Sequence, residues 1–377
     1  MLHPVKPVTC LPEMNKLLEF QRGVLELGIA IAKGDATNDE IGFKKVLGID
    51  AGQWFWKRCE ESSRTWSKYL KKFVNACKKY PKHSQKLLDI FDHDKNFEMH
   101  LSDNTYSFQY PLLPIILKKG IRPLLEFFYH YFASTGFGSE IHDNKGFTLT
   151  RETFLVAYQD TNANNFLYVC PVCDTDFSDL NSRGIPECEL DHFFPKSSYP
   201  MLSIHPFNLI PACNSCNSKR KGKKDPLKNG QKPTADAGSF TNTYHPAHGR
   251  SIRDLGKILI SRVNLTDRFT IEIEDNHSLP HYRIETAKRI YDLPGRWNGR
   301  VNFQKKVIKE IIERVIDQSR LRNNPTMQQM LTDLQQEHSH TKVSERADHY
   351  LRSAYFSYVF QNSEEQDFLY GLVYAAK

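Results

Sequence analysis

The chain has 377 residues, of which 40% are hydrophobic and 25% charged, and its formal net charge is +7. This composition is that of a folded protein long enough for two or three domains, and it excludes an intrinsically disordered chain. The moderate positive charge is compatible with a polyanionic partner without requiring one.

The sequence shows no sign of a membrane segment. No stretch approaches the roughly 20 apolar residues that span a bilayer. The N-terminal residues carry prolines and lack a continuous apolar core, so they do not resemble a signal peptide. We therefore expect a cytoplasmic protein that does not associate with a membrane.

Residues 14–160 are predicted to be mostly helical. Apolar residues recur along one face of 14–33, and 62–91 suits one or two helices broken near Pro81. The aromatic-rich stretch 112–132 is predicted to be a core helix. We assign residues 1–164 to a helical N-terminal domain that binds the target or docks a partner.

The pattern changes between residues 165 and 232, where cysteine, proline and asparagine replace helical periodicity. Beyond them, 269–274 alternates like a strand. Residues 301–322 and 348–360 are predicted to be helical, and the apolar stretch 368–376 is predicted to dock on the protein or on a partner. Residues 233–377 are thus assigned to a mixed, mostly helical C-terminal domain. The expected fold class is α+β, mainly α, with a small module at 165–232 inserted between two helical regions.

Two Cys-x-x-Cys pairs lie in that module: Cys170 with Cys173, and Cys213 with Cys216. In a reducing compartment such pairs favour metal over disulfides, and four thiolates suit a structural zinc ion. The alternative is two unrelated pairs of buried cysteines. The 39 residues between the pairs (174–212) exceed the roughly 15–20 of a zinc ribbon, so a further element is inserted there.

The insert carries polar residues in a recognisable order. Residues 187–196 are ECELDHFFPK and residues 208–219 are NLIPACNSCNSK. A Cys pair, then Asp191 and His192, then Asn208 ahead of the second Cys pair, then Asn217 and a basic run resembles the HNH (ββα-metal) endonucleases. The string is most similar to zinc-clipped members, including endonuclease VII-like junction resolvases and several restriction and phage-defence nucleases. The resemblance covers residues 170–224, about 55 of the 377.

The resemblance implies a role for each of these residues. Asp191 and Asn217 are expected to bind a catalytic Mg²⁺ or Mn²⁺, because hard cations prefer oxygen ligands. His192, neutral at cytoplasmic pH, is expected to be the general base that takes a proton from water. Asn208 is expected to brace the loop that orients the histidine at the end of the first strand. A helix beginning near Cys213 would bring Asn217 to the metal.

Each assignment also has a structural interpretation. An aspartate and a histidine before a proline are common in turns, and Asn208 could be only a turn residue. Asn217 could merely cap a cysteine knuckle. We prefer Asn217 to Asn214 as the metal ligand because it directly follows the last cysteine, as in the family.

Basic residues beside the motif are predicted to contact the nucleic-acid backbone, because positive charge positions phosphates. They are Lys196, Lys219, Arg220, Lys221, Lys223 and Lys224. For the lysines after Arg220, the competing interpretation is a solvated surface segment that binds nothing. Residues 62–88 hold eight further lysines and arginines and no acidic residue, and they are a second candidate for a DNA-backbone face.

The leading hypothesis from the sequence is a metal-dependent HNH endonuclease that hydrolyses DNA, with RNA not excluded, as the effector of a restriction or phage-defence system. The alternative is a zinc-stabilised nucleic-acid-binding or adaptor subunit that is inactive without a partner. The sequence has no Walker-type phosphate loop, so any NTP dependence would come from a sensor or NTPase partner. The sequence is also compatible with a homo-oligomer.

Overall fold

The computed structural model describes residues 8–61, 65–101, 103, 105–161, 169–175, 177, 187–227, 245, 256–262, 269–275, 288–298 and 349–376, together with seven single positions between 309 and 336. Within these residues the fold is mainly helical, with two small antiparallel sheets. The α+β, mainly α class expected from the sequence is confirmed. The helix predicted over 301–322 lies almost entirely outside the described residues.

The helices before the cysteine-rich module are α1 Leu11–Lys33, α2 Glu40–Leu47, α3 Ile49–Glu60, α4 Thr65–Lys79, α5 Pro81–Gln85, α6 Leu87–Lys95, η1 Phe97–His100, η2 Tyr110–Leu112, α7 Ile115–Ser134, α8 Ser139–His142 and α9 Arg151–Thr161. The module contains β1 Glu189–His192, η3 Pro200–Leu202, η4 Pro206–Asn208, β2 Leu209–Ala212 and the π-helix η5 Ser215–Lys221. The described C-terminal elements are β3 Gly256–Arg262, β4 Phe269–Asp275, α12 Leu293–Asn298, α15 His349–Gln361 and α16 Ser363–Ala376.

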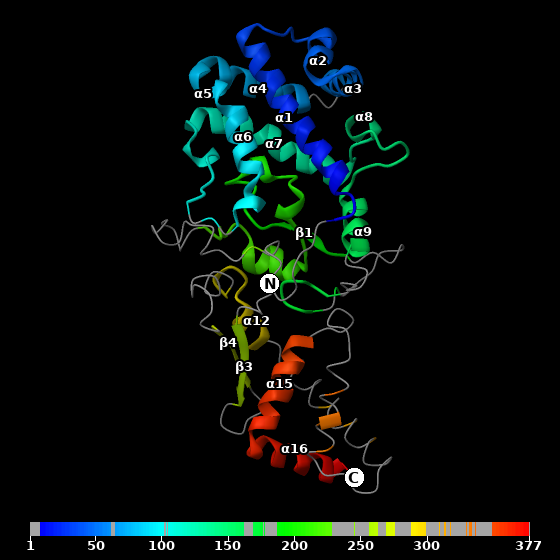
Figure 1. Ribbon diagram of the computed structural model, residues 1–377, viewed down its shortest axis with the longest axis vertical. Coiled ribbons are helices and arrows are strands. Elements are labelled where there is room, and N and C mark those ends of the chain that lie inside the picture. The colour runs from blue at the N-terminus through cyan, green and yellow to red at the C-terminus, as the bar shows by residue number, and fades with distance from the viewer. Residues whose placement is uncertain are drawn as a thin grey trace.

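These elements follow one another along the long axis of the molecule. The helices from α1 to α7 form one end, the strand β1 lies near the middle, and β3, β4, α15 and α16 form the other end (Figure 1). Among the described residues, no helix combines the length and the apolar character that a bilayer crossing requires.

Local sequence signals account for the N-terminal helices. Helix α1 buries Leu17, Val24 and Leu27 completely, which is the helical face that the sequence indicated. It ends where Gly34 adopts a left-handed conformation with φ of 87°. The break predicted near Pro81 is confirmed, because this proline occupies the first turn of α5, where its missing N–H costs nothing.

Helices α4 and α7 cross in close contact at Gly120. A Cβ atom at this position would lie 2.5 Å from the Cβ of Ala76 and 3.2 Å from the carbonyl oxygen of Lys72. Glycine therefore permits the two backbones to approach. Because α7 also reaches the module, this crossing sets the position of the site relative to the helical end.

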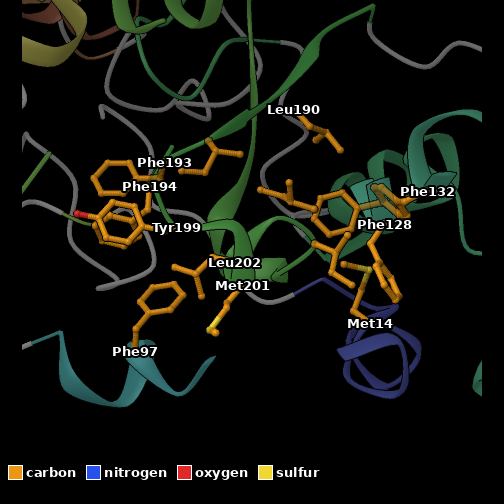
Figure 2. Close-up of a cluster of buried hydrophobic side chains, with 14 of the residues drawn as sticks. Met14, Phe97, Phe128, Phe132, Leu190, Phe193, Phe194, Tyr199, Met201 and Leu202 are labelled. Carbon is orange, nitrogen blue, oxygen red and sulfur yellow. The ribbon is translucent and has the colours of Figure 1, made fainter. Parts of the chain in front are cut away.

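The antiparallel hairpin β1–β2 packs on the helical end through apolar side chains. Leu190 lies near Phe128 and Phe132 of α7, whereas Phe194 gathers with Phe97 on the other side of the strand (Figure 2). The rings of Phe97 and Phe194 meet edge to face at 5.4 Å. The module is thus held on both sides by buried apolar contacts.

The second sheet pairs β3 with β4 in antiparallel register, with Ile260 opposite Ile271. The strand predicted over 269–274 is confirmed as β4. Its partner β3 was not predicted, because a short apolar run such as GKILISR suits a strand or a buried helix equally well. The helix predicted over 348–360 is confirmed as α15, and Leu369 of α16 is buried.

Candidate functional site

Four cysteine sulfurs converge at one end of the hairpin. The Sγ atoms of Cys170, Cys173, Cys213 and Cys216 lie within 4.8 Å of one another, and three of the four residues are buried. All four are free thiols, and the sulfurs of Cys173 and Cys213 are 3.9 Å apart. Thiolates at 2.3 Å from a tetrahedral zinc ion would be separated by about 3.8 Å. The cluster therefore has the donors and the spacing to hold a metal ion such as zinc.

Each Cys-x-x-Cys pair forms a tight backbone turn. In the first, the N–H of Asp174 donates to the carbonyl of Cys170 at 2.8 Å, and Asp174 takes a left-handed φ of 61°. In the second, the N–H of Cys216 donates to the carbonyl of Cys213 at 2.9 Å. These turns point both sulfurs of a pair to the same side.

Hydrogen-bond donors face two of the four sulfurs. The backbone N–H of Cys213 donates to the sulfur of Cys170 at 3.4 Å, and Arg296 donates to the sulfur of Cys213 at 3.3 Å. The pKa of the Cys213 thiol is lowered, most by its contacts with the other three thiols and further by the Arg296 guanidinium. Sequence reasoning missed Arg296, which lies 83 residues beyond Cys213.

The aspartate and the histidine of the motif stand at the end of β1. Asp191 is opposite Ile210 and His192 is opposite Leu209 in the hairpin. Asp191 is 1% exposed and His192 8% exposed, so both side chains are nearly enclosed. The strand end predicted for this pair coincides with the end of β1.

Asn208 ties the loop after β1 to the start of β2. Its side-chain oxygen accepts from the N–H of Phe194 at 2.7 Å. Its amide nitrogen donates to the carbonyls of Phe194 and Leu202 at 3.1 and 2.9 Å. The residue is fully buried, and these bonds fix the segment that directly follows His192.

The imidazole of His192 is held in one orientation. Its Nε2 lies 2.9 Å from the carbonyl oxygen of Ser203. Because a carbonyl can only accept, Nε2 carries the proton and Nδ1 keeps its lone pair. The ring packs edge-on against Tyr129 of α7 at 4.4 Å. Burial, with a smaller contribution from the charge of Lys196, lowers the pKa of His192 to about 3, so the ring is neutral.

The carboxylate of Asp191 is paired within the chain. Lys221 lies 2.9 Å from Oδ1, and the hydroxyl of Tyr291 donates to Oδ2 at 3.0 Å. Burial raises the pKa of Asp191, and the nearby Lys221 ammonium opposes that rise. Lys221 was expected at a nucleic-acid surface. The structure instead buries the Lys221 side chain beside Asp191. The ion pair compensates the charge of the Asp191 carboxylate, which would be costly to bury without a partner.

The helix η5 meets β1 through a second polar contact. Asn214, Asn217 and Ser218 all donate to the carboxylate of Glu189, two residues before Asp191. Burial alone would raise the pKa of Glu189, but these hydrogen bonds lower it. The amide nitrogen of Asn217 thus donates to Glu189, whereas the sequence analysis predicted that its oxygen shares a metal ion with Asp191.

Among the described residues, the four cysteines are the group whose His, Cys, Asp or Glu ligand atoms cluster closely enough for a metal ion. Asp191, Glu189 and His192 do not form such a group. The structure brings the motif residues to one hairpin and one helix, where side chains engage Asp191 and Asn217 and backbone groups engage His192 and Asn208.

The predicted nucleic-acid contacts divide into two kinds. Lys219 and Lys223 are exposed. Arg220 pairs with Asp292, and Lys224 donates to the carbonyl of Arg289 at 3.1 Å. Arg220 and Lys224 therefore contact the segment 288–298 of the same chain.

Lys196 lies 4.2 Å from the centre of the Tyr129 ring, which also contacts His192. A cation over an aromatic face is stabilised by the ring's negative charge density. Burial lowers the pKa of this lysine. Lys196, which was predicted to contact nucleic acid, thus packs against Tyr129 in this structure.

Residues 288–298 contact the module at both Asp191 and Cys173. Tyr291 reaches Asp191, and the indole N–H of Trp297 donates to the carbonyl of Cys173 at 3.3 Å. Tyr291 and Trp297 are both almost fully buried. No periodicity or motif in the sequence marks this segment, so sequence reasoning had no signal by which to find it.

Comparisons with known proteins give two partial likenesses. No protein-family model matches the chain, and no solved structure matches it. The chain is 26% identical over 129 residues to Septu protein PtuB of Bacillus thuringiensis, which is 33% of this chain and 48% of PtuB. It is 47% identical over 54 residues to protein ea31 of Escherichia phage lambda, which is 14% of this chain and 16% of ea31. The chain thus spans about half the length of PtuB and less of ea31.

Proposed function

We propose that the chain is a metal-dependent endonuclease of the HNH type that hydrolyses DNA phosphodiester bonds. The observation that carries this proposal is the fixed orientation of the His192 imidazole at the end of β1. A general base must be unprotonated and must present a lone pair. With its Nε2–H committed to Ser203, the ring offers that lone pair at Nδ1.

In the proposed reaction, Nδ1 of His192 takes a proton from a water molecule. The resulting hydroxide forms the new bond to phosphorus, and the bond from phosphorus to the 3′ oxygen breaks. The departing oxygen takes a proton from solvent, which leaves 5′-phosphate and 3′-hydroxyl ends. Exposed Lys219 and Lys223 lie on the helix and turn beside the site and would attract the phosphate backbone.

Asp191 and Asn217 would hold the Mg²⁺ or Mn²⁺ ion, because a carboxylate and an amide oxygen suit a hard cation. When bound, such a cation supplies charge neutralisation at the phosphate and the leaving oxygen. Asp191 is neutralised here by Lys221, and Asn217 donates to Glu189. The side-chain oxygen of Asn217 is a donor that suits the cation, and at Asp191 the cation would have to displace Lys221 or Tyr291.

We propose that zinc in the four-cysteine cluster is structural. Cys216, a cluster member, and Asn217 are adjacent on η5, so the cluster fixes the helix that faces β1. Four protein thiolates leave no open position for substrate, as in structural zinc sites. The module at 165–232, between helical domains at 1–164 and 233–377, would then be the nuclease unit.

The likeness to Septu protein PtuB points to a phage-defence system. We propose that the chain acts as the nuclease of such a system, together with a partner protein that senses infection or hydrolyses NTP. DNA is the proposed substrate, with RNA as the second possibility to be tested.

A second function is favoured by one observation. Both oxygens of Asp191 are engaged, one by Lys221 and one by Tyr291, and the amide of Asn217 is engaged by Glu189. A site satisfied in this way suits a nucleic-acid-binding or adaptor subunit that is silent until a partner rearranges it.

The test is cleavage of plasmid, single-stranded DNA, branched DNA and RNA by purified protein with Mg²⁺ or Mn²⁺. Wild type and His83→Ala, which removes an exposed imidazole on α5, are expected to cut the same substrate. His192→Ala is expected to keep its fold and zinc content and to lose cutting. Equal cutting by His192→Ala would refute the nuclease assignment. If wild type cuts only after a partner is added, the protein alone is in the inactive, adaptor-like state.

A further inference from the structure

A cavity of about 490 Å³ opens beside the module, between the start of α7 and the loop that follows β1. This volume lies in the range of small-ligand sites. The proposed chemistry at His192 does not use it. Its walls come from segments far apart in the sequence, because residues 107–122 form one side and residues 197–199 the other.

The cavity has a basic side. Lys118, Lys119 and Arg122 of α7 line it, and no acidic side chain is among the described residues that do. Lys118 donates to the carbonyl of Pro111 at 2.9 Å, and Arg122 pairs with Glu126 one turn further along the helix. Lys119 is exposed. Lys118 is the fourth residue of α7 and so lies at its N-terminal turn, where the helix dipole disfavours a cation and favours an anion.

The opposite side is apolar and aromatic. Phe108, Tyr110 and Tyr199 line the cavity and are each largely buried, and the rings of Phe108 and Tyr199 meet at 4.7 Å. Ser197 and Ser198 add hydroxyl groups between the two sides. A ligand that matches these walls has a flat apolar part and an anionic part, which is the chemistry of a nucleoside phosphate.

Helix α7 connects this cavity to His192. Lys118, Arg122 and Tyr129 are spaced by four and seven residues, so they share one face of the helix. Tyr129 is the residue whose ring contacts His192. Seven residues of helix from Arg122 to Tyr129 span about 10 Å, so the cavity and His192 lie within reach of one nucleic-acid strand.

We propose that the cavity is a subsite for one nucleotide of the strand that is cut, a few nucleotides from the scissile phosphate. Its phosphate lies against Lys119 and Arg122, and its base lies against the aromatic side at Phe108 and Tyr199. This subsite rests on the proposed nuclease function, because the strand that it holds is the one cut at His192. A free nucleotide has the same chemistry, so the test separates it from a strand.

The test measures binding in the His192→Ala background, in which no cleavage occurs. Fluorescence anisotropy reports the affinity for a labelled single-stranded oligonucleotide, and competition reports that for free dAMP and ATP. Lys119→Glu and Arg122→Gln alter the cavity. Lys57→Glu, at an exposed lysine of α3 outside it, is the matched control for a general loss of positive charge.

Lys119→Glu is expected to weaken oligonucleotide binding about tenfold or more. The slope of log affinity against log salt concentration should fall by about the amount that one phosphate contact contributes. Arg122→Gln is expected to act in the same direction, and Lys57→Glu to change affinity less than about twofold. Equal effects of Lys119→Glu and Lys57→Glu would overturn the subsite. Tight binding of free nucleotide that Lys119→Glu abolishes, with the oligonucleotide unaffected, would also overturn it.

The two proposals fail separately. If wild type cuts no nucleic acid with or without its partner but Lys119→Glu still loses oligonucleotide affinity, the nucleotide site stands and the nuclease assignment falls. If wild type cuts and Lys119→Glu cuts and binds as the control does, the subsite alone falls.

Discussion

The hydroxyl of Tyr291 donates a hydrogen bond of 3.0 Å to the carboxylate of Asp191, which lies 100 residues earlier in the chain. Both residues are about 1% exposed. The contact joins the C-terminal segment 288–298 to the motif strand β1. Asp191 is thereby held between a phenol on one oxygen and Lys221 on the other.

Replacing Tyr291 by phenylalanine removes this donor while keeping the ring. A lost hydrogen bond to a charged group costs about 1.5–3 kcal/mol of unfolding free energy. Loss of a partner that orients a metal-binding carboxylate lowers activity by about 10–100-fold. Urea unfolding and initial cleavage rates measure the two effects.

Tyr355→Phe is the matched control, because this buried tyrosine donates to Glu365 at 2.8 Å far from the motif. It should lose comparable stability and keep the cleavage rate. A Tyr291→Phe protein that cuts as fast as Tyr355→Phe would show that the Tyr291 contact serves the fold alone.

Lys221 is expected to stabilise the fold through its ion pair with Asp191. Lys221→Met leaves a buried carboxylate without its cation, which costs about 3–5 kcal/mol. Adding Asp191→Asn should recover most of that loss, because the uncompensated charge is removed. Urea titration of the two single variants and the double variant measures the coupling. A Lys221→Met protein as stable as wild type would contradict the pairing.

The four-cysteine cluster is expected to carry about one zinc ion per chain, as four thiolate donors provide for. Cys213→Ser should abolish zinc binding and lower the melting temperature, because metal affinity contributes to folding. Cys188→Ser, at a buried thiol of the same module outside the cluster, should retain the zinc. Elemental analysis reads the outcome, and a Cys213→Ser protein with full zinc would exclude this ligand set.

The stability of the protein should fall as pH is lowered from about 6.5, in part because of His205. Burial lowers the pKa of this histidine to about 3, against a partly opposing hydrogen bond to the carbonyl of Lys95. The unfolded chain then binds a proton between pH 6.5 and 3 that the folded chain does not. Stability therefore rises with pH in that window, by about 1.4 kcal/mol per pH unit for one such group.

His205→Gln keeps an N–H donor for Lys95 and removes the titration. The carboxylate of Glu98 also faces this ring at 3.5 Å, and burial raises its pKa. Urea unfolding at several pH values should give a shallower acid slope for the variant than for wild type. Identical slopes would mean that His205 does not titrate in this way.

Much of the fold is encoded locally and could be predicted. The apolar face of 14–33 gave α1, and Pro81 separated α4 from α5 because proline suits a first helical turn. The cysteine pairs indicated their own convergence, since each spacing permits one tight turn. These features depend on neighbours a few residues apart.

The rest of the site depends on contacts between distant segments. Nothing near Asp191 in sequence indicates that Tyr291 will reach it, or that Lys221 will be buried rather than exposed. The engagement of Asn217 by Glu189 depends on how η5 lies along β1. Such contacts depend on how distant segments pack together, which cannot be predicted from a single sequence.

The most direct measurement is the single-turnover rate of DNA cleavage by wild type and His192→Ala at equal zinc content, with and without added imidazole. Loss of a general base lowers the rate by about 10²–10⁴-fold. The account predicts a loss of this size in His192→Ala and partial recovery when imidazole supplies the missing base. Cleavage by His192→Ala at the wild-type rate would contradict the assignment of His192, and with it the proposed active site.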